Sequence, residues 1–366
     1  MKKTVLVIFG TRPEAIKLAP LIKELSRSPH FNVKVCSSAQ HIELLNQMLT
    51  FFKINVDYDL NIMTKNQSLF AINATCLTKL EAVITEEKPD LIVVQGDTST
   101  AFSGAMAGFY AKIPVAHIEA GLRTYDNNNP FPEEMNRKLI SQIATFHFAP
   151  NRVNKTYLEN EGVKNKIWIV GNTGIDALFL TKKYIENGFK PSIDLTIDPA
   201  KNNLLVTGHR RENIGPPFTQ LCDQLIKLAQ RDDINIIFPL HLNPKLKQIA
   251  QKKLAQQPNI ILVEPLPYPE FVWIMQQVDL IITDSGGVQE EAPYFKVPVL
   301  VTRKITERTE LLNKNSKLIN LEETSLVTEV LNVLNKKELH IKHNQEYPYG
   351  DGHTSKKILD ILQQHL

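Results

Sequence analysis

Acidic side chains stand at the ends of apolar runs in the first half of the chain. Asp97 ends "DLIVVQGD", and Glu119 follows "IPVAHI" directly before a small Ala-Gly pair. A third acid, Glu133, opens a helical pattern after Pro132. Positioned carboxylates are common acids and bases, so three of them at one site would suit a reaction that moves a proton. Asp97 could instead cap the next helix, and Glu133 could simply favour the helix dipole.

Two basic side chains follow the first apolar run, "TVLVIFG". Arg12 and Lys17 lie in "TRPEAIK", where Gly10 suits a tight turn and Pro13 suits the first turn of a helix. Arginine and lysine beside a helix N-terminus would bind an anion, and a phosphate fits best. A capped helix that carries two surface cations fits the same residues.

Basic residues also follow an apolar run in the second half of the chain, in "TGHRREN". His209 and Arg210 stand there beside a second arginine. A histidine among arginines would support a departing phosphate or hold a carboxylate. An ordinary basic cluster on the surface would have the same composition.

A turn of small residues in "TDSGGVQEEAP" offers another place for phosphates. Ser285, Gly286 and Gly287 follow an apolar run and open a helix, so their backbone N–H groups would suit a diphosphate. Glu291 would take ribose hydroxyls, and Phe271 would stack on a nucleobase unless it belongs to the core. The sequence has no GxGxxG motif and no GxxxxGK[ST] loop, which argues against NAD and against P-loop hydrolysis of ATP. Because no zinc or iron ligand spacing occurs, no metal is expected.

These residues follow short apolar runs that alternate with helical patterns. Such a series predicts an α/β fold with parallel sheets covered by helices. The series restarts after "FKPSIDLTIDPAKN", which predicts two similar domains facing across a cleft that the carboxyl ends of both sheets line. We expect an N-terminal domain over residues 1–171, joined by a last helix over 353–366, and a C-terminal domain over 172–352.

The composition excludes several classes of protein. The chain has 366 residues, of which 43% are hydrophobic, so it can bury a large core. Lysine plus arginine (42) barely exceeds aspartate plus glutamate (39), and no basic run marks a nucleic-acid or membrane surface. No apolar stretch approaches the roughly 18 residues of a membrane span. Cys36, Cys76 and Cys222 lie far apart and suit a reducing cytoplasm, so we expect a cytoplasmic protein.

Eight segments form a pattern that spans almost the whole chain in order. They are "GTRPEAIKLAP", "QGDTST", "HIEAGLRT", "PFPEEMNR", "TGHRREN", "HLNP", "TDSGGVQEEAP" and "YPYGDG". Together they resemble the bacterial non-hydrolysing UDP-N-acetylglucosamine 2-epimerases. The resemblance implies a GT-B-like pair of Rossmann-like domains and interconversion of UDP-GlcNAc and UDP-ManNAc without a cofactor. In this scheme the C2 proton and UDP leave to give a glycal, and re-addition inverts C2. A homodimer is also expected.

The resemblance further implies roles for individual residues. Proton transfer, or its support, would fall to Asp97, Glu119, Glu133 and His209. The phosphates would face Arg12 and Lys17. Around UDP the resemblance places Phe271, Ser285, Gly286, Gly287, Glu291 and Arg308. Thr309 stands beside Arg308 where relatives commonly have proline, which affects the shape of that loop.

Many members of this family bind a second UDP-GlcNAc as an activator beside the active site. The residues that match this second site are Gln40, His41, Glu133, Arg210 and His241. Glu43 stands where glutamine is expected, and Asn66 stands where arginine is expected. Activation should therefore be weaker than in relatives, because one charge-assisted contact is missing.

Three other functions fit parts of the pattern. They are a hydrolysing epimerase that releases ManNAc and UDP, a GT-B glycosyltransferase, and a non-catalytic sensor of sugar nucleotides. Hydrolysing relatives tend to carry an "RADY"-like segment where this chain has "RPEA". A transferase needs an acceptor groove and only one base, and a sensor needs fewer acids.

Overall fold

The chain folds into two compact units. The computed structural model describes residues 2–38, 42–64, 67–164, 166–189, 191–193, 195, 197–208, 215–240, 243–335, 339 and 347–366. Unit 1 comprises Met1–Leu180 with Pro348–Leu366, and unit 2 comprises Thr181–Tyr347. The chain therefore passes between the units twice. The domain boundary expected at residue 171 stays a prediction.

Unit 1 is built on one parallel sheet. Its strands are β1 (Lys3–Phe9), β2 (Phe31–Ser37), β3 (Tyr58–Asp59), β4 (Leu91–Gln95), β5 (Val115–Ile118), β6 (Phe146–Ala149) and β7 (Ile167–Ile169). They lie in the order β3-β2-β1-β4-β5-β6-β7, and the paired neighbours are parallel. The helices are α1 (Arg12–Arg27), α2 (Ile42–Phe52), α3 (Leu69–Glu87), α4 (Ser99–Tyr110), α5 (Glu133–Ile143), α6 (Arg152–Asn160) and α13 (Thr354–His365).

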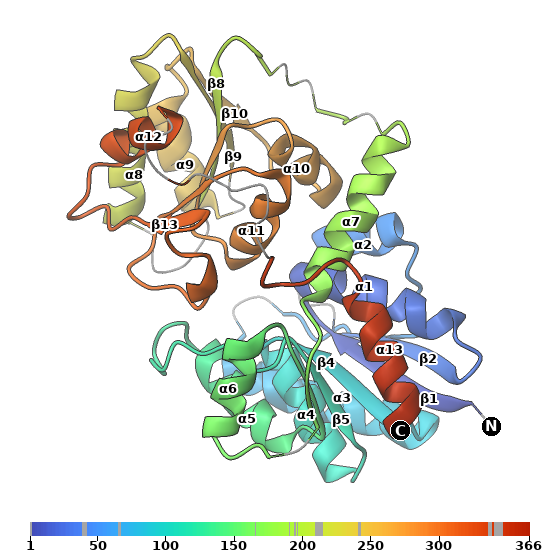
Figure 1. Cartoon of the computed structure of the whole chain (residues 1–366). Coiled ribbons are helices and arrows are strands. Elements are labelled where there is room, and N and C mark those ends of the chain that lie inside the picture. Colours follow the sequence, from blue (N-terminus) through green and yellow to red (C-terminus); the bar gives the residue numbers. More distant parts are fainter. Residues whose placement is uncertain are drawn as a thin grey trace. The chain divides into compact units, whose positions relative to one another are not determined.

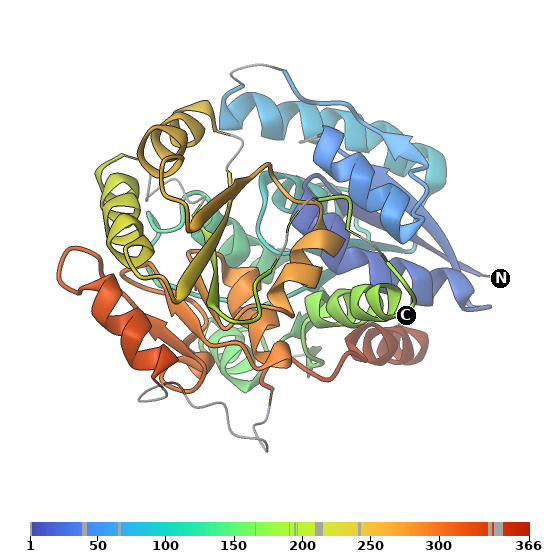
Figure 2. The same cartoon turned by 90° about the horizontal axis from the view of Figure 1, so that it is seen from above.

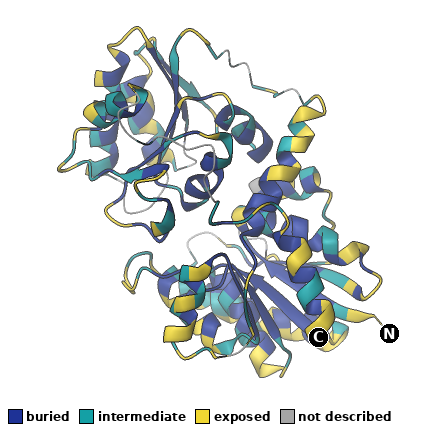
Figure 3. Ribbon diagram, in the orientation of Figure 1, coloured by how far each residue is buried: buried dark blue, intermediate teal, exposed yellow. Residues whose placement is uncertain are grey.

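Alternate residues of β1 enter two different layers of the core. Val5, Val7 and Phe9 pack with residues of α1 and α13, whereas Leu6 and Ile8 pack with residues of α3 and α4. Because successive side chains of a strand point to opposite faces, one apolar run serves both layers. The inner strands β4, β5 and β6 are accordingly buried along their length, whereas the edge strands β3 and β7 are partly exposed. The outer faces of the helices are exposed (Figure 3).

The last helix of the chain belongs to unit 1. α13 lies beside α1 (Figure 1) and contributes Ile358 and Leu362 to the same core layer. Asp176 accepts hydrogen bonds from the backbone N of Thr354 (3.0 Å) and of Ser355 (2.6 Å). It comes from α7 (Thr173–Glu186), along which the chain passes from unit 1 to unit 2. A carboxylate at a helix N-terminus satisfies N–H groups that lack partners within the helix.

Unit 2 repeats this plan with a second parallel sheet. Its strands are β8 (Asn202–Thr207), β9 (Ile234–Pro239), β10 (Ile260–Val263), β11 (Leu280–Thr283), β12 (Val299–Val301) and β13 (Ser316–Leu318), in the order β10-β9-β8-β11-β12-β13. The helices are α8 (Pro216–Ala229), α9 (Pro244–Leu254), α10 (Tyr268–Met275), α11 (Gly286–Glu291) and α12 (Leu326–Leu334), with 3-10 turns η2 (Ala292–Phe295) and η3 (Thr309–Leu311). Figure 2 shows α9, α8 and α12 in a row along one face of the sheet.

Both sheets reverse their strand order at one point. In unit 1 the reversal lies between β1 and β4, and in unit 2 it lies between β8 and β11. Ligands of open α/β sheets bind beyond the carboxyl ends of the strands at such a point. The turns that hold Arg12, Asp97 and Ser285 follow β1, β4 and β11. The two parallel sheets confirm the predicted α/β class, although the short strands β3 and β13 were not predicted.

Candidate active site

The turn between β1 and α1 is closed around Gly10. A Cβ atom added to Gly10 would collide with the side-chain oxygens of Ser38 and Thr100, which hydrogen-bond each other at 2.8 Å. The turn is also fixed by Glu14, whose Oε2 accepts hydrogen bonds from the backbone N of Gly10 (3.1 Å) and of Thr11 (2.7 Å). Glycine is therefore required here by close packing, and two backbone donors of the turn are already occupied.

Glu14 is a structural residue of this turn. It is 1% exposed, and its Oε1 accepts a hydrogen bond from the Thr98 hydroxyl (2.7 Å), which joins the first turn to the one after β4. Burial raises the pKa of Glu14, and the hydrogen bonds from Thr98 and from the β1–α1 turn act in the opposite direction. The glutamate of "TRPE" thus shapes the loop, and the cations beside it remain the candidates for binding.

Arg12 occupies the first position of α1. It has no hydrogen-bond or ion-pair partner among the described residues, and burial lowers the pKa of its guanidinium. A partly buried cation costs free energy unless an anion meets it. Within the described part of the chain, Arg12 is thus suited to receive an anionic ligand.

Lys17 lies on the same helix and pairs with Glu119. Its Nζ donates to Oε1 (2.6 Å) and Oε2 (2.8 Å) of the Glu119 carboxylate, 102 residues further along the chain. Two neutral amides also donate to this carboxylate: Gln95 Nε2 donates to Oε2, and Asn172 Nδ2 donates to Oε1 (2.8 Å). The carboxylate is held by donors on both oxygens, which stabilise its ionised form.

The backbone of Glu119 is unusual as well. Its φ is 64°, in the left-handed region that residues other than glycine rarely adopt. Glu119 directly follows Ile118, the last residue of β5. A non-glycine residue in this region costs about 1–3 kcal/mol, and such residues cluster at functional sites. Local strain combined with a buried carboxylate, 6% exposed, makes Glu119 a strong candidate for a role in function.

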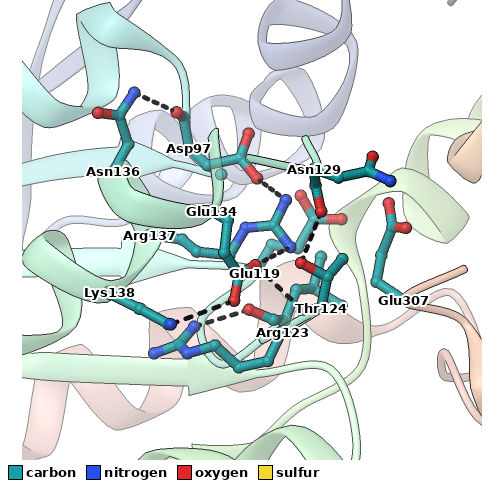
Figure 4. Close-up of polar contacts among 12 residues, drawn as sticks. Asp97, Glu119, Arg123, Thr124, Asn129, Glu134, Asn136, Arg137, Lys138 and Glu307 are labelled. Carbon is teal, nitrogen blue, oxygen red and sulfur yellow. Dashed lines mark hydrogen bonds and ion pairs between the residues drawn. The ribbon is translucent and has the colours of Figure 1, made fainter. Parts of the chain in front are cut away.

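Asp97 belongs to a second cluster of charges, which Figure 4 shows. Its Oδ2 lies 2.7 Å from Arg137 Nη2, and Arg137 Nη1 lies 3.4 Å from Glu134 Oε2. The Asn136 amide also donates to the backbone O of Asp97 at 2.9 Å. Asp97 does not cap the helix that follows: Thr98 does, because Ala101 N donates to Thr98 Oγ1 at 3.0 Å. The capping alternative for Asp97 is wrong.

The two adjacent glutamates at the start of α5 differ in their surroundings. Glu133 is half-buried, whereas Glu134 is fully buried and accepts hydrogen bonds from the backbone N of Thr124 and of Tyr125, both at 3.0 Å. Glu134 thus fixes the loop after β5. Its structural role did not follow from the sequence, because its partners lie about ten residues earlier, in an irregular loop.

In unit 2 the small residues expected to bind a diphosphate begin helix α11. Ser285 is the residue before its first turn, and Gly286 and Gly287 are its first two residues. A Cβ on Gly286 would lie 2.7 Å from Cζ of Arg308, whereas a Cβ on Gly287 would meet no described atom within 4 Å. Gly286 therefore allows the guanidinium of Arg308 to lie against the turn, and among the described residues nothing fills the space beside Gly287.

Arg308 is part of a buried network of charges. Its Nε donates to Glu290 Oε1 at 2.8 Å, its Nη1 donates to Glu307, and Glu307 Oε2 accepts from Arg303 Nη1 at 2.9 Å. Two arginines and two glutamates alternate in this network, so the buried charges offset one another. The network fixes the guanidinium of Arg308 against the start of α11.

Glu291 and Phe271 both belong to helices of unit 2, Glu291 to α11 and Phe271 to α10. The Tyr268 hydroxyl donates to Glu291 Oε1 at 3.0 Å, and both residues are buried. Burial, and next the charge of Glu291, raise the pKa of Tyr268 well above its usual value, so its hydroxyl stays a donor. Phe271 is half-buried in the first turn of α10.

Several predicted residues lie outside the described part of the chain. They are the candidate acid or base His209 and the residues of the expected activator site, Gln40, His41, Asn66, Arg210 and His241. Glu43 belongs to α2, but its side chain is not described. Among the predicted site residues, the structure brings Lys17 to Glu119 and Arg308 to Gly286, although neither contact was predicted.

Two general features complete the description of the site. Among the described residues, no group of three or more His, Cys, Asp or Glu side chains could hold a metal ion. A search of the same residues found no helix with the length and apolar character of a membrane span.

Known proteins and a family model are similar to this chain over nearly its whole length. A family model described as UDP-N-acetylglucosamine 2-epimerase matches residues 23–363. The chain is 43% identical to an Escherichia coli (strain K12) UDP-N-acetylglucosamine 2-epimerase, over 99% of this chain and 98% of that protein.

Solved structures agree with this match. The UDP-GlcNAc 2-epimerase from Neisseria meningitidis, bound to UDP-GlcNAc, superposes with a TM-score of 0.93 at 40% identity and covers 99% of this chain and 100% of its own. The S. aureus MnaA-UDP co-structure gives a TM-score of 0.90 at 39% identity, covering 99% of this chain and 96% of its own. The fold is thus GT-B-like, with two Rossmann-like domains. The chain belongs to the UDP-N-acetylglucosamine 2-epimerase family.

Proposed function

We propose that the protein interconverts UDP-N-acetylglucosamine and UDP-N-acetylmannosamine without releasing free sugar. The forward step removes the C2 proton and breaks the C1–O bond, so that UDP leaves with the bond electrons and a glycal remains. The reverse step returns a proton to the other face of C2 and re-forms the bond from C1 to UDP. Carbon acids of this kind are weak, so the reaction needs positioned bases and a cationic site for the departing diphosphate.

The observation that carries this proposal is the environment of Glu119. Its carboxylate is buried, held in a strained backbone conformation and bound by Lys17, Gln95 and Asn172 at the carboxyl edge of the sheet. Donors on both oxygens favour the ionised form, which suits a base. Asp97 follows β4, the strand next to the one that precedes Glu119, and it pairs with Arg137. It is the second acid that we assign to proton transfer, and Glu133 and His209 are the others.

The cations of unit 1 suit the leaving group. Arg12 has no partner within the described residues, and Lys17 carries its ammonium on a flexible stem. We assign both to the diphosphate. In this scheme Lys17 moves from Glu119 to the diphosphate when the substrate binds, which frees one lone pair of the carboxylate to accept the C2 proton.

Unit 2 would bind UDP. The solved relatives from Neisseria meningitidis and S. aureus are bound to UDP-GlcNAc and UDP, respectively. We assign the N–H groups after Ser285 to the diphosphate, Glu291 to the ribose hydroxyls and Phe271 to the uracil. We also assign Arg308 to UDP, with its guanidinium held in place by Glu290 and Glu307.

We further propose a homodimer that acts in the cytoplasm. Large apolar side chains are exposed on the adjacent helices α3, α4 and α5, among them Phe70, Phe109 and Leu139. Such exposure is typical of surfaces that contact another chain. The three cysteines are buried and unpaired, as suits a reducing compartment. Light scattering after size exclusion should give about twice the chain mass of 41.5 kDa.

A second nucleotide sugar would act as activator at Gln40, His41, Arg210 and His241, with weaker affinity than in relatives because of Glu43 and Asn66.

The main proposal is tested by incubating the protein with UDP-GlcNAc and separating the products. A mixture of the two UDP-sugars supports it. Free ManNAc with UDP would select the hydrolysing reaction instead.

A further inference from the structure

Asn172 lies where two distant segments of unit 1 cross. Its backbone N donates to the carbonyl O of Tyr349 at 2.7 Å, and a Cβ on the preceding Gly171 would lie 3.1 Å from Cα of Gly350. Gly171 has a φ of 99°, so both the conformation and the close approach require glycine. The backbone of Asn172 is therefore fixed by its contact with Tyr349 and by the close packing of Gly171 on Gly350.

The side chain of Asn172 is fixed at both ends as well. Its Oδ1 accepts a hydrogen bond from Gly174 N at 2.9 Å, and its Nδ2 donates to Glu119 Oε1 at 2.8 Å. Because a backbone N–H needs an acceptor and a carboxylate needs a donor, these two partners determine which way the amide points. Asn172 is 1% exposed and has little freedom to rotate.

The donors to Glu119 are not equivalent. Lys17 contacts both carboxylate oxygens through one flexible ammonium, so it supplies charge but little orientation. Gln95, at the end of β4, and Asn172 each bind one oxygen from a buried backbone site. Two donors on different oxygens define the plane of the carboxylate, and a single ammonium does not.

We propose that Asn172 is a positioning residue for Glu119: it orients the carboxylate and favours its ionised form until the C2 proton is accepted, once Lys17 has turned to the diphosphate. This inference rests on the proposed function. Asn172 itself touches no reacting atom in this scheme, and its effect on the rate passes through Glu119.

The alternative is that Asn172 serves only to cap α7, since its Oδ1 occupies the usual acceptor position at that helix start. The substitution Asn172→Asp separates the two roles. Aspartate caps a helix as well as asparagine does, but it cannot donate to Glu119 and places a like charge beside it. Asn172→Ser also keeps a capping oxygen and adds no charge, but it replaces the amide donor by a hydroxyl that lies closer to the backbone and farther from Glu119. Ser68→Ala is the matched control, because it removes the cap of α3, where Ala71 N donates to Ser68 Oγ at 3.2 Å.

The experiment measures kcat, KM, the pH profile of kcat/KM and the melting temperature for the wild type and the three variants. We expect Asn172→Asp to lower kcat about 10- to 100-fold with KM little changed. The acidic limb of its pH profile should move upward by about one unit, because the ionised carboxylate loses a donor and gains a like charge. Asn172→Ser should change both quantities in the same direction, but less. Ser68→Ala should lower only the melting temperature.

An Asn172→Asp or Asn172→Ser variant with wild-type kcat and an unmoved pH profile would overturn the inference. So would a loss of activity that follows the melting temperature and leaves the pH profile in place. If Asn172→Asp fails to fold, Asn172→Ser decides the question. A wild-type protein that does not epimerise UDP-GlcNAc would contradict the proposed function itself, which separates the two failures.

Discussion

Arg137 holds the carboxylate of Asp97 at 2.7 Å, and the hydroxyl of the next residue, Thr98, caps the helix that follows. The two neighbours thus have different roles at the end of β4. Thr98 stabilises the start of α4, and the carboxylate of Asp97, which does not cap the helix, is the candidate acid or base. We expect Asp97→Asn to lower turnover about 10²- to 10⁴-fold, the usual worth of a positioned acid or base. Its melting temperature should change little.

Thr98→Ala provides the contrast for this prediction. It removes both the cap of α4 and the hydrogen bond to Glu14, so it should cost about 1–2 kcal/mol of stability. Equal losses of stability in the two variants, or full turnover in Asp97→Asn, would assign Asp97 to the structure instead.

Glu119→Gln tests the second acid. The amide keeps the volume but removes the charge that Lys17 meets, and it brings an N–H group toward donors that need an acceptor. Turnover should fall about 10²- to 10⁴-fold, with a smaller effect on UDP affinity, because in the proposed scheme UDP contacts Lys17 and not this carboxylate itself. Steady-state kinetics and calorimetric titration with UDP measure the two effects. A parallel loss of both would point to general disruption of unit 1.

Gly286 and Gly287 should respond to alanine in opposite ways. Gly286→Ala forces a Cβ against the guanidinium of Arg308 and should destabilise the free protein by about 1–3 kcal/mol. Gly287→Ala meets no described atom within 4 Å and replaces a helical glycine, so the free protein should be as stable as the wild type or slightly more so. If the diphosphate lies against this turn, Gly287→Ala should still weaken UDP binding about tenfold or more. Unchanged UDP affinity in Gly287→Ala would place the diphosphate elsewhere.

Stability should depend on pH through His117. Burial lowers the pKa of His117 from 6.5 to about 3, and its Nε2 contacts the carbonyl O of Gly96 at 2.7 Å. Between these values the unfolded chain binds a proton that the folded chain does not, so stability falls as the pH drops below 6.5. Each such proton contributes a slope of about 1.4 kcal/mol per pH unit.

Urea unfolding of the wild type and of His117→Gln between pH 4.5 and 7.5 measures this slope. Glutamine can donate to Gly96, and it does not titrate. The slope below pH 6.5 should be smaller in the variant by about one proton. Identical slopes in the two proteins would show that His117 is not the group that titrates.

The fold could be predicted from the sequence because it depends on local patterns. The runs "TVLVIFG", "DLIVVQGD" and "DLIITDSGG" are buried strands of parallel sheets, and these read as continuous apolar runs. β3 and β13 escaped prediction because Tyr58–Asp59 and Ser316–Leu318 contain polar residues and form no continuous apolar run, unlike the similarly short β7 and β12. The family was also recognised from short motifs, and the comparisons confirm it.

The details of the site depend on contacts between distant residues, which no local pattern shows. Glu119 stood out as a carboxylate that needs a partner, but its partners Lys17 and Asn172 lie 102 and 53 residues away. Glu14 lies in the motif that suggested a phosphate site, yet it binds the turn itself. The strained backbone of Glu119 had no signal in the sequence, because its glutamate side chain gives no hint of a positive φ.

The most direct test of the proposed reaction is incubation of the protein with UDP-GlcNAc in deuterated water, followed by proton and carbon NMR. Removal and return of the C2 proton within an intact nucleotide sugar predicts deuterium at C2 of both UDP-GlcNAc and UDP-ManNAc, with the C1–O bond to UDP present in both. Free ManNAc as the deuterated product would contradict the account in favour of hydrolysis. UDP-GlcNAc that keeps its C2 proton throughout would contradict it in favour of a glycosyltransferase or a sensor.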